Sequence, residues 1–291
     1  MFMMTGLAKH RASTEGFSGL PSPRLYIYYV NGRVPGHDER FFGPSFIGNW
    51  QEDNSAFLFF TEAADEEISA FLADRPGLGL TDRFEMSYED WHGGPILPFK
   101  SGRFRIMPPW SQVEVEAGEL GILMDPGVVF GAGNHPTTRD CLNALQCLMA
   151  QEAPGPMETV LDLGAGTGLL AIAAVRLGAR RALAVDNIYL AAATTANNVR
   201  SNRLDGRVQA VCGRAEDFIG CPADLVVANI HYDVMRQLVV SPGFKQKKGF
   251  VLSGLMRSQA RRVKAVLAES GAHIREEWIQ DGIWHTICGS N

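Results

Sequence analysis

The C-terminal part of the chain alternates between two hydrophobic patterns. Short apolar runs rich in β-branched residues are separated by longer segments whose apolar positions recur at helical spacing. The expected strands are residues 159–163, 181–186, 207–212, 224–230 and 248–254, and the expected helices are residues 168–178, 189–202, 232–240 and 257–270. Because such alternation places helices on both faces of a parallel sheet, it predicts a doubly wound α/β fold.

The end of the chain departs from this alternation. Residues 273–280 and 283–288 are both strand-like, and no helical segment separates them. Asp281-Gly282 between them is a two-residue turn signal of the kind that joins antiparallel strands. We therefore expect an antiparallel hairpin at the end of a mostly parallel sheet.

The N-terminal part has a different pattern. Residues 24–30 and 56–61 are aromatic and β-branched runs that suit strands. Residues 62–74 follow with apolar positions at helical spacing and end before Pro76-Gly77. Strands followed by a helix predict a small α+β domain.

Glycine and proline interrupt the segment from Trp91 to Trp110, which lies between these two parts. A chain of 291 residues is long enough for one large domain and a smaller one. We expect an N-terminal substrate-recognition domain over residues 1–89, a linker over 90–110 and a catalytic domain over 111–291.

The composition limits the classes of partner. A net charge of -5 and a pI near 5.8 argue against binding nucleic acid through the whole surface, because phosphates require a basic face. Residues 1–11 lack the apolar core of a secretory signal, and no later window reaches the roughly 18 apolar residues of a membrane span. We expect a cytoplasmic protein with no membrane partner and no direct nucleic-acid partner.

The five cysteines suggest neither a disulfide framework nor a metal site. They are Cys141, Cys147, Cys212, Cys221 and Cys288. Their number is odd and no two of them form a CxxC pair, which is the spacing typical of zinc ligands. We expect reduced thiols and no bound metal.

The strand at residues 159–163 runs directly into a glycine-rich turn. Gly164, Gly166 and Gly168 permit positive φ angles and a close approach of ligand to backbone, at the turn from strand to helix. The next strand ends at Asp186, at about the spacing from which a carboxylate accepts the ribose hydroxyls of a nucleoside. Together these residues predict a nucleoside pocket.

Two cofactors suit such a pocket. NAD-dependent dehydrogenases use GxGxxG, with a helix N-terminus directed at pyrophosphate, whereas the spacing here is GxGxG and position 169 is Leu. Asp162 precedes the loop, where a carboxylate would repel pyrophosphate but could order the loop around a cationic amino-acid group. The pattern therefore favours S-adenosylmethionine, and the structural alternative is a glycine turn that merely ends a buried strand.

A glycine-rich segment from Met124 leads into the helical pattern of residues 139–149. Thr137 or Thr138 is expected to cap that helix, and its hydroxyl either faces a ligand or serves the cap alone. His135 is a candidate ligand, base or buried turn histidine, and its residue type favours the last.

The fourth strand ends at Asn229, beside the place expected for the sulfonium. Its side chain carries a donor and an acceptor with which to orient a nucleophile, although a strand-end Asn is often only a turn residue. His231 and Tyr232 follow, and they either line the acceptor channel or lie on the surface.

In combination these motifs resemble the PrmA family, the bacterial methyltransferases of large-subunit ribosomal protein L11. The matching segments are Asp125-Pro126-Gly127, Phe130 to Thr138, Leu161 to Gly168, Val227 to Ile230, Leu252-Ser253-Gly254, Ser258-Gln259-Ala260 and Glu89-Asp90-Trp91. The resemblance covers about residues 55–291. It implies a seven-stranded catalytic domain joined to an N-terminal recognition domain, with Thr138, Gly164, Asp186 and Asn229 contacting S-adenosylmethionine.

The chain departs from the family pattern at several positions. Asn134 stands where the family usually has Thr, and Asn187-Ile188 stands where the family commonly has an acidic residue followed by Pro. After Asn229-Ile230 this chain has His231, where the family has an aliphatic residue. A second tryptophan soon after Trp91 is absent, and the first 50 residues match poorly. Because the family recognises its substrate with that region, the departures bear most on the identity of the acceptor.

The resemblance implies that lysine ε-amines and an α-amine of a ribosomal protein attack the sulfonium methyl group in line. We expect Asn229 and the Ile230 carbonyl to orient the amine, while water or His231 takes the proton. Three alternatives stay open: a methyltransferase of the same fold for another protein or a small molecule, a non-catalytic S-adenosylmethionine-binding module, and an NAD-dependent dehydrogenase. The oligomeric state cannot be predicted from these patterns.

Overall fold

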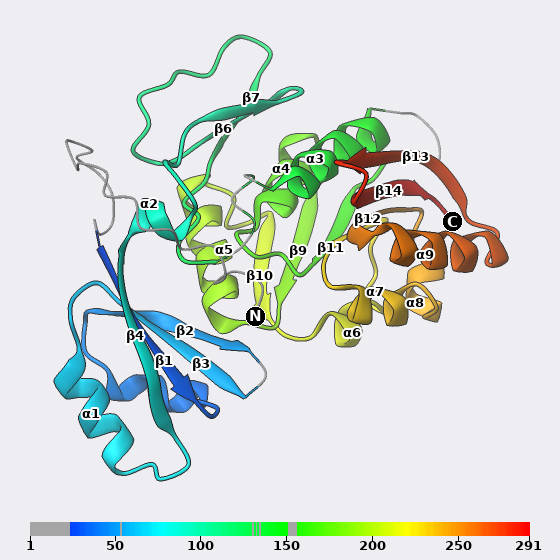
Figure 1. Ribbon diagram of the computed structural model, residues 1–291. Helices are drawn as coiled ribbons and strands as arrows, with labels where there is room; N and C mark the ends of the chain where they lie inside the picture. The colour runs from blue at the N-terminus through cyan, green and yellow to red at the C-terminus, as the bar shows by residue number, and fades with distance from the viewer. Residues whose placement is uncertain (1–23, 53, 130, 132, 134, 151–155) are drawn as a thin grey trace.

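The computed structural model describes residues 24–291 apart from 53, 130, 132, 134 and 151–155. Within these residues the chain forms three sheets, the largest of which carries helices on both faces (Figure 1). No helix in this part of the chain is long and apolar enough to cross a bilayer. The predictions for residues 1–11, and the motif positions Phe130 and Asn134, lie outside the described residues.

Four antiparallel strands form the N-terminal sheet in the order β2-β3-β1-β4. The elements are β1 (Arg24–Asn31), a 3-10 helix (Gly36–Phe41), β2 (Phe46–Glu52), β3 (Ser55–Phe60), α1 (Asp65–Ala73) and β4 (Gly79–Ser87). Alternation along β1 places Tyr28 and Val30 on the face covered by α1, where Phe71 is fully buried. The strands and helix expected between residues 24 and 74 are present. β4 was not expected, because most of its side chains are exposed and show no apolar alternation.

Regular structure also occurs inside the predicted linker. β5 (Phe99–Ser101) and β6 (Phe104–Met107) are antiparallel, and β6 pairs in parallel with β7 (Leu120–Leu123). The prolines and glycines of this segment lie between the strands rather than within them. The division of the chain into domains at residues 90–110 stays a prediction.

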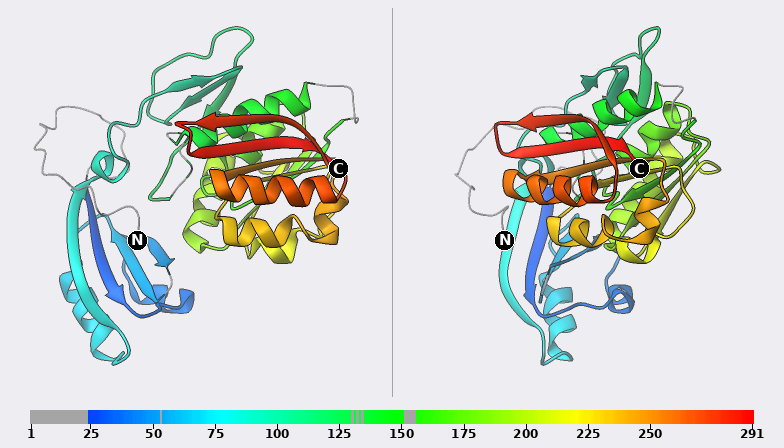
Figure 2. Two further views of the ribbon diagram at one scale, coloured as in Figure 1. Left: turned by 45° about the vertical axis from the view of Figure 1, so that its right-hand side comes forward. Right: turned by 90° about the vertical axis from the view of Figure 1, so that its right-hand side faces the viewer.

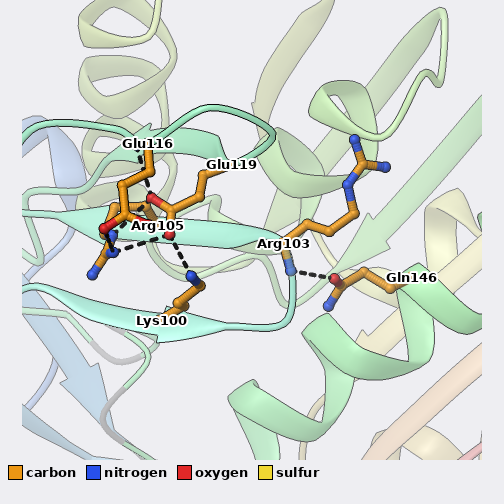
Figure 3. Close-up of polar contacts among 6 residues, drawn as sticks. All are labelled: Lys100, Arg103, Arg105, Glu116, Glu119 and Gln146. Carbon is orange, nitrogen blue, oxygen red and sulfur yellow. Dashed lines mark hydrogen bonds and ion pairs between the residues drawn. The ribbon is translucent and has the colours of Figure 1, made fainter.

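Charged side chains hold this short sheet together (Figure 3). The Glu119 carboxylate accepts two hydrogen bonds from the Arg105 guanidinium, at 2.9 and 3.0 Å, and lies 2.6 Å from Lys100 Nζ. The backbone N–H of Arg103 donates to Gln146 Oε1 at 2.7 Å, which attaches the sheet to α3 (Pro136–Met149).

The largest sheet has the strand order β10-β9-β8-β11-β12-β14-β13. Its strands are β8 (Thr159–Leu163), β9 (Arg181–Asp186), β10 (Val208–Cys212), β11 (Leu225–Asn229), β12 (Gly249–Met256), β13 (His273–Gln280) and β14 (Trp284–Ser290). The helices are α3, α4 (Leu169–Arg176), α5 (Tyr189–Ser201), α6 (Ala215–Phe218), α7 (Tyr232–Leu238), α8 (Pro242–Lys245) and α9 (Arg257–Glu269). All pairings are parallel except those of β14, which is antiparallel to both β12 and β13.

Helices α3, α4 and α5 cover one face of this sheet, and helices α7, α8 and α9 cover the other. The chain winds outward through β9 and β10 on one side of β8 and through β11 and β12 on the other. The prediction of a doubly wound, mostly parallel seven-stranded sheet ending in an antiparallel hairpin is confirmed. The carboxyl ends of β8 and β11 therefore form the switch point at which such sheets bind ligands.

A short helix, α2 (Tyr88–Trp91), leads from the N-terminal sheet to the larger domain. The Tyr88 hydroxyl donates to Asp125 Oδ1 at 2.9 Å, and His92 Nε2 lies 2.8 Å from the Gly127 carbonyl oxygen. Apolar residues of β1 and β3 share a buried cluster with Leu190 of α5. These contacts hold the two parts side by side (Figure 2).

Candidate functional site

The glycine-rich turn after β8 has the conformation that its sequence predicts. Gly164, Gly166 and Gly168 have φ angles of 74°, 56° and 79°, which disfavour any residue with a β-carbon. A β-carbon at Gly164 would lie 2.1 Å from Ile230 Cγ2, and one at Gly168 would lie 2.7 Å from Thr195 Cγ2. The turn therefore fits closely between the end of β11 and helix α5.

A cavity of about 670 Å³ opens at the switch point beside this turn. That volume lies within the roughly 300–1,000 Å³ range of small-molecule sites. Of the residues predicted for the site, it brings together Thr138, Gly164, Gly166, Asp186, Asn229 and His231. Asp162, Gly168 and Tyr232 do not line its wall.

Asp186 ends β9 and borders the glycine turn. One of its carboxylate oxygens accepts from the Gly166 N–H at 2.9 Å and the other from the Ile188 N–H at 3.0 Å. A carboxylate has about four lone-pair sites, so two backbone donors leave it able to accept ligand hydroxyls. Burial raises the pKa of Asp186, and the two backbone N–H groups oppose that rise. This arrangement suits a carboxylate that accepts the hydroxyls of a ribose.

Asp162 lies behind the loop rather than in the cavity. Its side chain is 1% exposed, and Oδ2 accepts from the backbone N–H of Ala171 in α4 at 2.9 Å. Burial raises the pKa of Asp162 to about 7. The carboxyl group thus joins β8 to α4 behind the loop and does not itself line the cavity, and its expected role in ordering the loop around the cofactor stays a prediction.

The segment before α3 contains one correction to the sequence analysis. His135, and neither threonine, is the N-cap residue of α3, with Pro136 at the first helical position. Thr138 therefore lies in the first turn, where its buried hydroxyl has no hydrogen-bond partner among the described residues. Because a buried unpaired hydroxyl costs free energy and Thr138 lines the cavity, it fits a polar ligand atom.

Asn229 ends β11, the strand that pairs with β8, and lines the cavity beside the glycine turn. Its Nδ2 donates to Thr137 Oγ1 at 3.3 Å, a contact between residues 92 positions apart. Gly254 has a φ of 80°, and a β-carbon there would lie 3.2 Å from Asn229 Oδ1 and 3.0 Å from the Ile230 carbonyl oxygen. Only glycine at 254 keeps a side chain away from these two oxygens.

His231 is exposed and lines the cavity next to these oxygens. It precedes α7, at the N-cap position, and its side chain makes no capping hydrogen bond. Tyr232 is half-buried and packs on the apolar cluster beneath α7 instead. The structure therefore separates two neighbours that the sequence could not distinguish.

Three charged residues of the cavity wall were not predicted. Arg214 and Glu216 follow β10 and form an ion pair at 3.0 Å. Arg33 follows β1 and reaches the same wall from the N-terminal part of the chain. The position of Arg214 and Glu216 after a parallel strand was a usable signal, whereas nothing near Arg33 in the sequence points to the cavity.

Comparison with known proteins identifies relatives that match most of this chain. Residues 62–291 match the model of the family described as Ribosomal protein L11 methyltransferase (PrmA). The ribosomal protein L11 methyltransferase of Pelotomaculum thermopropionicum is 37% identical over 228 residues, 75% of this chain and 72% of that protein. Its counterpart in Desulforamulus reducens is 30% identical over 280 residues, 91% of this chain and 87% of that protein.

A solved structure shares the fold. The crystal structure of ribosomal protein L11 methylase from Lactobacillus delbrueckii subsp. bulgaricus is similar, with a TM-score of 0.54 and 26% sequence identity. The similarity covers 66% of this chain and 95% of that one. Part of this chain therefore has no counterpart in that structure.

Proposed function

The chain belongs to the ribosomal protein L11 methyltransferase (PrmA) family, and on that premise we propose that it methylates amines of ribosomal protein L11 with S-adenosylmethionine. One observation supports this most directly. The cavity at the switch point is lined by Thr138, Gly164, Asp186 and Asn229, the four positions that the family resemblance implied. They come from helix α3, the turn after β8, and the ends of β9 and β11.

The residues of the cavity suit this cofactor, which supplies an activated methyl group. Asp186 accepts ribose hydroxyls with the lone pairs that its two backbone donors leave free. The turn at Gly164 lets the ligand approach the backbone, and Thr138 provides a buried hydroxyl that has no partner among the residues the structure describes. Asp162 keeps the turn in place from behind.

Asn229 and the Ile230 carbonyl orient the acceptor amine. Both have an oxygen beside Gly254, so two acceptors are available to the N–H groups of one neutral amine. With its hydrogens held, the amine directs its lone pair at the methyl group, and alignment of this kind can lower a barrier by several kcal/mol. Asn229 thus acts on the nucleophile as well as lining the cofactor cavity.

The acceptor amine must lose a proton before it attacks. A lysine with a pKa of about 10.4 costs roughly 4 to 5 kcal/mol to deprotonate at pH 7, unless desolvation lowers the pKa. His231, exposed on the cavity wall, or a water molecule takes this proton. The N-terminal domain, residues 1–89, recognises the protein that carries the amine.

Methyl transfer from tritiated S-adenosylmethionine tests the proposal. The expected result is incorporation into purified ribosomal protein L11, and loss of incorporation when the amines of L11 are first blocked by acetylation. Asn229→Ala should lower kcat at least tenfold, while Asn197→Ala, a change on the exposed face of α5, should not. Full kcat in Asn229→Ala would overturn the role given to Asn229.

The same assay distinguishes the alternatives. Incorporation into another component of a lysate, with none into L11, would identify a methyltransferase with a different acceptor. Calorimetric binding of S-adenosylhomocysteine without any transfer would identify a binding module. Tight binding of NAD in place of S-adenosylhomocysteine would refute the proposal altogether.

A further inference from the structure

A chain of three polar side chains leads from the loop before α3 to Asn229. Asn229 Nδ2 donates to Thr137 Oγ1 at 3.3 Å, and Thr137 Oγ1 lies 2.7 Å from His135 Nδ1. Asn229 lines the cavity, whereas Thr137 is 1% exposed and neither it nor His135 is part of the wall. Thr137 and His135 therefore lie behind the group that orients the amine.

The backbone determines the direction of the hydrogen bonds in this chain. The N–H of Thr137 points at His135 Nδ1 from 3.4 Å, as the N-cap geometry of α3 requires. Because a backbone N–H can only donate, Nδ1 must offer a lone pair, and a neutral ring then carries its hydrogen on Nε2. Burial lowers the pKa of His135, which favours that neutral ring.

The single hydrogen of the Thr137 hydroxyl is then used in the hydrogen bond to His135 Nδ1. With a lone pair on Nδ1, the 2.7 Å contact requires the hydroxyl to donate to the ring. The oxygen of Thr137 can only accept from its other neighbour, so it faces the NH₂ group of Asn229 and not its carbonyl oxygen. Asn229 Oδ1 consequently points away from Thr137, toward Gly254, which the Ile230 carbonyl oxygen also approaches.

We propose that His135 is a positioning residue for methyl transfer, holding the Asn229 amide through Thr137 so that its carbonyl oxygen faces the acceptor amine. This inference rests on the proposed function. If the Asn229 side-chain amide were rotated by 180°, its NH₂ group would face the N–H groups of the acceptor amine. Both groups would then be donors, and no hydrogen bond could form between them. The ring of Trp284 meets His135 edge-on, 5.3 Å between centroids and 79° between planes, and holds the imidazole in place.

The first test asks whether an acceptor at position 135 is what matters. His135→Ala removes the acceptor, whereas His135→Asn keeps one, because an Asn side chain at an N-cap accepts from the same backbone N–H. We expect kcat for the acceptor protein to fall roughly tenfold in His135→Ala, the order of one hydrogen bond, and to recover most of that loss in His135→Asn. The affinity for S-adenosylhomocysteine, measured by calorimetry, should stay within about twofold in both.

The second test asks whether His135 acts through Thr137. Thr137→Val removes the hydroxyl at nearly constant volume, and Thr137→Ser retains it. We expect Thr137→Val to lower kcat, Thr137→Ser to do so much less, and His135→Ala to have no further effect when Thr137 is already Val. Additive losses in the double variant, or equal kcat in His135→Asn and His135→Ala, would overturn the proposal.

A third measurement does not depend on turnover. In ¹⁵N-labelled protein, the chemical shift of His135 Nδ1 reports whether that nitrogen carries a proton, and we expect it to carry none at pH 7. A protonated Nδ1 would refute the inference even if every variant failed to fold. Absence of methyl transfer in the wild-type protein would instead refute the proposed function, and the two failures are therefore distinguishable.

Discussion

Replacement of Gly164 by alanine tests how tightly the glycine turn is held against the end of β11. The change has two independent costs. A φ of 74° disfavours an L-residue by about 1–2 kcal/mol, and the new β-carbon would stand 2.1 Å from Ile230 Cγ2. Overpacking of that kind typically costs about 1–3 kcal/mol, so we expect Gly164→Ala to lower the free energy of unfolding by roughly 2–5 kcal/mol.

Urea unfolding of a double-mutant cycle separates these costs. Ile230→Ala removes Cγ2 and leaves space for the β-carbon at position 164, but it does not relieve the backbone strain. The double variant should therefore be more stable than the sum of the two single changes predicts, by about 1–3 kcal/mol. Parallel titrations with S-adenosylhomocysteine should show weaker binding in Gly164→Ala than in the wild type.

Matched slopes of the urea transitions are the control for this experiment, because they show that the variants unfold from equally compact states. Free energies that add within about 0.5 kcal/mol would show that Ile230 does not press on Gly164. The inference that the glycine turn packs closely against the end of β11 would then be refuted.

Three further substitutions should have different effects on stability, ligand binding and kcat. Thr138→Val should raise the thermal midpoint of the free protein, because it removes a buried hydroxyl that has no partner within the described part of the chain, yet weaken S-adenosylhomocysteine binding several-fold by calorimetry. Gly254→Ala should lower kcat by crowding the two amine-orienting oxygens, while leaving that binding nearly unchanged. Hydrogen bonds from Arg105 and Lys100 lower the pKa of Glu119 from 4.5 to about 2, so its contribution to stability is present above pH 4.5 and is lost as pH falls toward 2. Glu119→Gln should therefore flatten the pH dependence of the urea midpoint across that window, and an unchanged slope would contradict the assignment.

Much of the larger domain could be predicted because its signals are local. Apolar runs, helical spacing and Asp281-Gly282 each act over a few residues, and the strands and helices formed where these patterns place them. The positive φ angles at Gly164, Gly166 and Gly168 likewise follow from the only residue type that adopts them easily. The prediction failed at the start of α3, because a histidine side chain capped the helix in place of a threonine.

Structure that depends on distant partners was not visible in advance. β5 and β6 are short and lie among prolines and glycines, and they form a sheet because β7 and Gln146 of α3 supply the remaining hydrogen bonds. β4 is held in the sheet by its pairing with β1, but most of its side chains are exposed, and its sequence therefore shows no apolar alternation. The approach of Arg33 to the cavity depends on how the N-terminal sheet packs against α5.

By itself the sequence determined the class of fold and the glycine turn with its acidic residue, and it favoured S-adenosylmethionine over a dinucleotide, because each of these depends on residue types at short spacing. Only the tertiary structure decided which residues share the cavity, that Asp162 supports the turn from behind, and that Thr137 meets Asn229 across 92 positions of the chain. The tertiary structure also decided which end of the Asn229 amide faces Thr137, because the Thr137 hydroxyl has one hydrogen and cannot donate to both His135 and Asn229.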